Sequence, residues 1–177
     1  GVGMDVVNQN LKKINGKVDV KSKQGKGTKI KLRIPLTLAI IEGMILRVAE
    51  AKCIIPILSI KENFRPSLEL ITTTPDGQEI VRVREKFYPI LRLHKLLNIE
   101  PDAKSFDKGI LVMLEAHGKS ICLFVDELVG QQQTVIKGLS NYIGNIKGVS
   151  GCTILGNGEV SLILDASSMI DMTENLH

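Results

Sequence analysis

Three histidines are the first residues in this sequence to consider for catalysis or metal binding. They are His94, His117 and His177, and no serine, cysteine or carboxylate stands near them with the spacing of a catalytic triad or a metal site. His94 falls at an expected helix start, His117 in a hairpin turn and His177 at the chain end. We therefore expect surface or helix-capping roles, and the sequence predicts no catalytic residue and no metal site.

Cysteines and paired carboxylates lead to the same expectation. Cys53, Cys122 and Cys152 are odd in number, widely spaced and set among strand-like residues, which predicts buried, reduced thiols in a cytosolic protein. Asp126 and Glu127 are adjacent, and neighbouring strand residues point to opposite faces. They cannot face one cleft as an acid–base pair, so we expect a turn or surface role.

Glycines and lysines near the N-terminus could bind an anion. Gly1-Val2-Gly3 precedes an expected helix, where backbone N–H groups and the helix dipole favour a phosphate, although a plain turn would look the same. Residues 12–33 are rich in lysine, and alternation places most of these cations on one strand face. That face is either simply solvated or a polyanion site, and the pattern alone leaves both open.

Charge is distributed unevenly along the 177 residues. The net charge is +4, but residues 1–35 carry nine basic and two acidic groups, whereas residues 36–177 carry 14 basic and 17 acidic groups. This break predicts a domain boundary near Pro35. Aromatic residues make up only 3% of the chain, which argues against a nucleic-acid reader that stacks bases on aromatic rings.

Residues 1–35 read as a helix followed by a hairpin. Met4, Val7, Leu11 and Ile14 have the spacing of one buried helix face. Residues 17–21 and 29–34 alternate cationic and apolar side chains, which predicts two half-buried strands joined by a turn at residues 24–27.

Residues 36–177 read as a series of short strands and tight turns. Strong turn signals stand at residues 74–77, 117–119 and 157–158. A strand followed by a helix is expected at residues 87–97 and again at 160–170, which indicates an internal duplication. Residues 98–108 are polar and predict a connection between two half-barrels rather than a free linker.

Two sets of residues are candidates for binding a partner. Ile45 and Leu46 lie in a strand that is apolar on both faces, so one face serves a core and the other packs internally or against a partner. Arg84 and Arg92 are the second set, because arginine combines a carboxylate-binding fork with an apolar stem. Solvated strand charges fit these arginines equally well.

The N-terminal motifs resemble the ATP-binding domain of histidine kinases. Gly1-Val2-Gly3-Met4-Asp5-Val6-Val7 is similar to its second glycine box in the chemotaxis (CheA-type) subfamily. Gly25-x-Gly27-Thr28 and the segment 35–41 resemble the exit from that domain. The resemblance implies that Gly1, Gly3 and Thr28 are a remnant of an ATP site. The boxes that hold Mg²⁺ and adenine are absent here, so we expect no cofactor in this fragment, with ATP and Mg²⁺ bound only by the intact parent protein.

The remaining motifs resemble the CheW-like regulatory domain of the same kinases. They are residues 80–84, 88–93, 125–132, 135–137 and 151–160. The resemblance implies a mainly β fold of two SH3-like five-stranded barrels over residues 36–177, preceded by a helix-plus-hairpin remnant of an α/β domain. Two departures, Glu85 and Gly138, stand where the family usually has Gly and Pro, and these put local loop shape in question.

The combined interpretation is a docking fragment of a cytoplasmic chemotaxis histidine kinase. The resemblance implies binding to the coupling protein (CheW) and to chemoreceptor tips, in a parent protein that is a homodimer with ATP-dependent kinase activity. The fragment itself is expected to be catalytically inert and to bind no nucleic acid, and no apolar run is long enough to insert in a membrane. The alternative is a small-barrel polyanion or nucleic-acid binder that uses residues 12–33.

Overall fold

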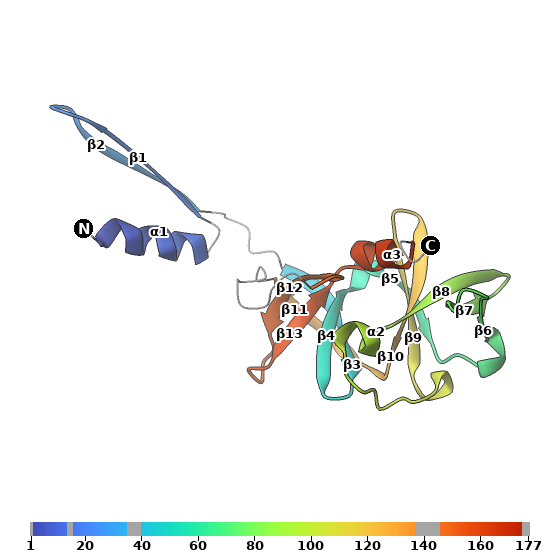
Figure 1. Cartoon of the computed structure of the whole chain (residues 1–177). Helices are drawn as coiled ribbons and strands as arrows, with labels where there is room; N and C mark the ends of the chain where they lie inside the picture. Colours follow the sequence, from blue (N-terminus) through green and yellow to red (C-terminus); the bar gives the residue numbers. More distant parts are fainter. Residues whose placement is uncertain (1, 14–15, 35–39, 137–145, 175–177) are drawn as a thin grey trace. The chain divides into compact units, whose positions relative to one another are not determined.

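The chain forms two compact units, residues 1–39 and 40–177 (Figure 1). A computed structural model describes residues 2–13, 16–34, 40–136 and 146–174. The predicted boundary near Pro35 lies outside these residues. Within the described ranges, no helix has the length and apolar character needed to cross a bilayer.

The described residues of the first unit form one helix and one hairpin. Helix α1 spans Gly3–Lys13, and strands β1 (Lys17–Lys23) and β2 (Gly27–Arg33) pair antiparallel. The prediction of half-buried strands is wrong in extent: Val20, Ile30 and Leu32 remain 50%, 54% and 51% exposed.

The second unit contains two antiparallel-rich sheets. The five-stranded sheet has the order β11 (Glu127–Val135), β3 (Ile40–Val48), β4 (Ala51–Pro56), β13 (Val160–Leu164) and β12 (Val149–Ile154). The six-stranded sheet has the order β5 (Ile60–Phe64), β9 (Ile110–Ala116), β10 (Lys119–Val125), β8 (Lys86–Arg92), β7 (Glu79–Val83) and β6 (Ile71–Thr73). Helices α2 (Leu93–Leu97) and α3 (Ala166–Glu174) follow β8 and β13, and short 3₁₀ turns η1 (Ile57–Ser59), η2 (Leu68–Leu70) and η3 (Phe106–Lys108) link other strands.

The expected internal duplication appears in the strand pairing. In each sheet an antiparallel hairpin, β3–β4 or β9–β10, pairs in parallel with a strand that leads into a helix, β13 into α3 or β8 into α2. Each sheet takes its hairpin from one half of the sequence and its other strands from the other half. Residues 98–108 therefore join the two sequence halves, but they do not divide one sheet from the other.

The five-stranded sheet curls until its outer strands meet. In the five-stranded sheet the hydroxyls of Thr134 and Thr153, on the two edge strands β11 and β12, lie 2.6 Å apart in a buried hydrogen bond. In the six-stranded sheet Glu62 of edge strand β5 pairs with Arg84, which follows β7. This mainly β arrangement confirms the predicted fold class. In the five-stranded sheet, side chains rather than a described backbone ladder join the two outer strands.

The largest hydrophobic core contains side chains from both sheets. It includes Leu46 and Cys53 from the five-stranded sheet and Val112 and Leu123 from the six-stranded sheet. Burial raises the pKa of the Cys53 thiol to about 12, and burial also raises that of Cys122 to about 12. The prediction of buried thiols is thus confirmed for these two residues.

Candidate docking site

The structure corrects the assignment of Ile45 and Leu46 as partner contacts. Leu46 is fully buried in the core between the sheets, and Ile45 is 9% exposed in a smaller cluster with Ile54 and Leu155. Strand β3 is apolar on both faces because both faces are covered within the chain. Internal packing, the alternative considered for this strand, is what the geometry supports.

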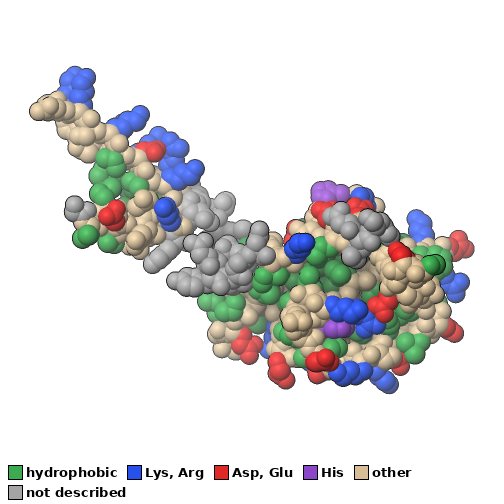
Figure 2. Space-filling model, viewed as in Figure 1, with side chains coloured by type: hydrophobic (Ala, Val, Ile, Leu, Met, Phe, Trp, Pro, Cys, Tyr) green, Lys and Arg blue, Asp and Glu red, His purple; other side chains and the backbone are tan. Residues whose placement is uncertain are grey.

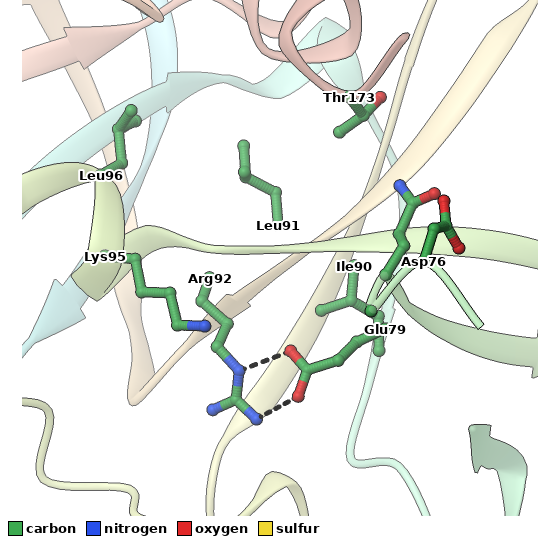
Figure 3. A pocket seen from close by; sticks show the side chains of 10 residues that line it. Asp76, Glu79, Ile90, Leu91, Arg92, Lys95, Leu96 and Thr173 are labelled. Atoms are coloured by element: carbon green, nitrogen blue, oxygen red, sulfur yellow. Dashed lines mark hydrogen bonds and ion pairs between the residues drawn. The ribbon is translucent and has the colours of Figure 1, made fainter. Parts of the chain in front are cut away.

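Arg92 is also held inside the chain. Its Nε and Nη2 atoms donate to the two carboxylate oxygens of Glu79 at 2.7 and 2.8 Å, in one wall of a pocket of about 450 Å³ (Figure 3). Its guanidinium carbon lies 4.1 Å from the centre of the Phe106 ring and 5.5 Å from that of Phe124. The hydrogen bond from Arg92 lowers the pKa of Glu79 below its usual range. Arg92 therefore has the contacts of a packing residue, and its role in an interface stays a prediction.

Lysine should not replace Arg92 without a loss of stability. The Arg92 side chain is only 17% exposed, and lysine cannot reproduce the two parallel hydrogen bonds or the stacking on Phe106. We expect Arg92→Lys to lower the free energy of unfolding, measured by urea denaturation, by about 1–2 kcal/mol. Arg84→Lys is the matched control, because Arg84 has the same bidentate geometry with Glu62 but is 72% exposed. Equal losses in both variants would refute the packing role of Arg92.

The turn between β7 and β8 carries exposed cationic and aromatic side chains. Arg84 has φ +57°, so the left-handed position falls on it and not on Glu85, where the family usually has glycine. Arg82 is exposed and lies directly opposite Phe87 in the hairpin, and Phe87 is 59% exposed. Arg84 thus remains accessible as a candidate contact, beside an aromatic residue that the sequence did not single out.

Leu58 is the most exposed large apolar residue in the described chain. It lies in turn η1, which leads from β4 into β5, and it is 97% exposed. The sequence reasoning missed it because residues 52–60 form one apolar run in which no local signal separates inward from outward side chains. Leu58 thus lies exposed between β4, which has a buried centre, and the partly exposed β5.

Asp126 lies in the bend between β10 and β11, as the expected turn role implies, but it is buried, so the expected surface alternative is wrong. Its oxygens accept the backbone N–H groups of Ala49, Asp102 and Ala103 at 2.7, 2.8 and 3.1 Å. Burial by itself raises the pKa of this carboxyl, but the three N–H groups outweigh it, so the pKa is lowered overall. Asp126 therefore ties the β3–β4 turn to the segment 98–108. Arg47 reinforces this tie through hydrogen bonds to Ala49, Asp102 and Glu127.

The expected nucleotide residues are only partly described. Gly1 lies outside the described residues, Gly3 is the first residue of α1, and the Thr28 hydroxyl lies 2.9 Å from that of Ser22 in the hairpin. No described group of three or more histidine, cysteine or acidic side chains could hold a metal ion. The described residues supply at most part of a site for ATP, so no step of phosphate transfer can be derived from them.

The histidines do not form a common site in the described structure. His94 lies in the first turn of α2, and burial lowers its pKa. His117 occupies the β9–β10 turn with φ +53°, and His177, like Gly138, lies outside the described residues.

A comparison with protein families matches residues 42–174 to the CheW-like domain. The chain belongs to the CheW-like domain family. Its fold resembles that of the scaffolding protein TtCheW from Thermoanaerobacter tengcongensis, with a TM-score of 0.60 and 20% identity over 71% of this chain and 88% of that one.

Curated relatives extend the similarity to most of the first unit. The chain is 39% identical over 169 residues to the chemotaxis protein CheA of Salmonella typhimurium, covering 96% of this chain and 25% of that protein. It is 38% identical over 176 residues to the sensor histidine kinase CheAY of Helicobacter pylori, covering 99% and 22%. This CheW-like chain thus spans about a quarter of the length of these relatives.

Proposed function

We propose that residues 40–177 are a docking module of a cytoplasmic chemotaxis histidine kinase. The module binds the coupling protein (CheW) and chemoreceptor tips, so that receptor state biases autophosphorylation by the kinase of which it is a part. The parent protein is a homodimer, and this chain acts by binding without catalysis of its own. The family match supports this assignment, together with a surface that leaves large apolar groups uncovered.

Leu58 and Phe87 are the residues that we propose to contact the partner. Isolated apolar side chains are common on protein surfaces, so exposure alone does not mark a binding site. Phe87, which is 59% exposed, lies directly opposite Arg82 in the hairpin that also carries Arg84, and aromatic residues and arginine are enriched at the centres of interfaces. Leu58 is 97% exposed. Exposed apolar contacts with a cationic rim suit a partner surface that has apolar pockets and carboxylates. Arg84 would exchange its contact with Glu62 for one with the partner.

Substitution of the exposed residues should weaken docking without unfolding the module. We expect Leu58→Ser and Phe87→Ser each to weaken binding of purified coupling protein about tenfold or more, because truncation of a hot-spot residue typically costs about 2 kcal/mol or more. Thermal stability should remain near that of the wild type. Val160→Ser, at a residue 62% exposed on the five-stranded sheet, is the control and should bind normally. Unchanged binding by both Leu58 and Phe87 variants would rule out these contacts.

Residues Gly1, Gly3 and Thr28 are proposed as part of a nucleotide site in the parent kinase. When bound there, ATP would supply the phosphoryl group, while the glycines would allow backbone N–H groups to approach its phosphates. Gly3 is the first residue of α1, and the space beside it is open, because an added Cβ there would meet no atom within 4 Å. Loss of nucleotide affinity in the intact kinase on Gly3→Val, with normal coupling-protein binding, would support this assignment.

A further inference from the structure

The hairpin of the first unit has two chemically different faces. The register places Lys21 opposite Lys29 and Lys17 opposite Arg33. With Asp19, Lys23 and Lys31, these residues share one face, because side chains alternate along a strand. Figure 2 shows the cations on the side of the hairpin away from α1 and hydrophobic side chains between the hairpin and α1. The basic face is therefore separate from the side that a core would cover.

The like charges on the basic face destabilise the hairpin. Like charges directly opposite each other destabilise a strand pair, and this ribbon has two such pairs. Asp19 offsets part of the repulsion through a 3.3 Å contact with Arg33, and both groups are largely exposed. If this face were only solvated, residues of opposite charge could stand at the paired positions of the two strands. The concentration of one sign instead favours an anionic partner.

A shallow hollow lies at the turn end of the hairpin. Residues 21–23 and 26–29 line about 320 Å³ there, and three of them, Lys21, Lys23 and Lys29, belong to the basic face. Ser22 and Thr28, whose hydroxyls lie 2.9 Å apart, alternate onto the opposite face. Several flexible ammonium groups around an open hollow suit a cluster of carboxylates better than a single planar anion, which arginine would clamp in a bidentate fork.

We propose that this basic face docks a carboxylate-rich surface of a protein partner. Asp19 stands in the middle of the face and would repel a uniform row of phosphates, whereas a protein surface can place a cation against it. The described part of the first unit has no aromatic side chain to stack on bases, and its basic face has no apolar anchor for a lipid interface. An acidic protein is thus the occupant that fits the charges. Its docking uses residues other than those proposed for the coupling protein.

Matched charge reversals in the full chain test this inference. The probe is poly-L-glutamate at about 0.15 M salt, compared with a short duplex DNA and with phosphatidylcholine vesicles that contain phosphatidylserine. We expect Lys21→Glu/Lys29→Glu to weaken poly-L-glutamate binding about tenfold or more. Lys86→Glu/Lys147→Glu changes the net charge equally in the second unit and should leave binding within about twofold of the wild type.

Carbodiimide cross-linking locates the contact independently of affinity. Zero-length cross-links from carboxylates of the probe should concentrate on Lys21, Lys23, Lys26 and Lys29. Equal weakening by both double variants, cross-links spread over both units, or tighter binding of the DNA or of the vesicles than of poly-L-glutamate would each overturn the proposal. Circular dichroism of the variants would verify that the reversals leave the fold intact.

Discussion

Replacing Asp126 with alanine is expected to lower the free energy of unfolding by about 3 kcal/mol. The carboxylate accepts three backbone N–H groups, and the substitution leaves the donors of Ala49, Asp102 and Ala103 without it. Ala49 has φ +49°, a conformation that a residue with a side chain adopts only when its surroundings hold it there. The loss should therefore also loosen the β3–β4 turn. Urea denaturation measures the free energy change.

The pH dependence of stability gives a second measure of Asp126. Its pKa is lower in the folded chain than in the unfolded chain, so its contribution is full above the unfolded value near 4 and is lost as the pH falls through the folded value. Asp126→Asn keeps the size of the side chain and removes this titration. We expect the asparagine variant to be less stable at neutral pH and to lose less stability on acidification than the wild type.

Glu127→Ala is the control for this prediction. Glu127 is adjacent to Asp126 but is 56% exposed, and its described ion pair is a single contact with Arg47. Its removal should change stability only slightly, since exposed ion pairs contribute little. If Glu127→Ala and Asp126→Ala were equally destabilising, the hydrogen bonds from backbone N–H groups to Asp126 would not be the source of the stability.

Leu46→Ala is expected to lower the free energy of unfolding by about 3 kcal/mol. Leu46 is fully buried among side chains from both sheets, so its truncation removes buried methyl groups and leaves a cavity between the sheets. Coupling-protein affinity per folded molecule should be unchanged, because the side chain does not reach the surface.

Ile40→Ala on the same strand is the matched control for Leu46. Ile40 is 62% exposed, and its truncation should change the unfolding free energy much less. If Leu46→Ala instead kept the stability of the wild type and lost coupling-protein binding, Leu46 would again be assigned as a partner contact.

Local sequence signals predicted the hairpins and the strand–helix units of this fold. The turns at residues 74–77 and 157–158 are found with Gly77 and Gly158 at φ +89° and +84°, where glycine has no steric penalty. The segment 87–97 forms β8 followed by α2, as its pattern indicated. These features depend on neighbouring residues, and such short-range preferences are readable from sequence.

The pairing between the two halves could not be read in the same way. Periodicity identifies a strand but does not say which distant strand it will join, and here the parallel pairs β4–β13 and β8–β10 connect different halves. Asp126 was missed for a related reason. Its partners are backbone groups from segments distant in the sequence, and they leave no pattern of side chains. Leu58 was hidden within an apolar run because exposure is decided by tertiary packing.

Calorimetric titration of purified coupling protein into this chain tests the docking function most directly. At about 0.15 M salt, where weak charge interactions are screened, we predict saturable binding with one coupling protein per CheW-like unit. The same chain should show no comparable affinity for duplex DNA. Absence of coupling-protein binding by the folded chain, together with tight and salt-sensitive DNA binding through residues 12–33, would contradict the account and favour the polyanion-binding alternative.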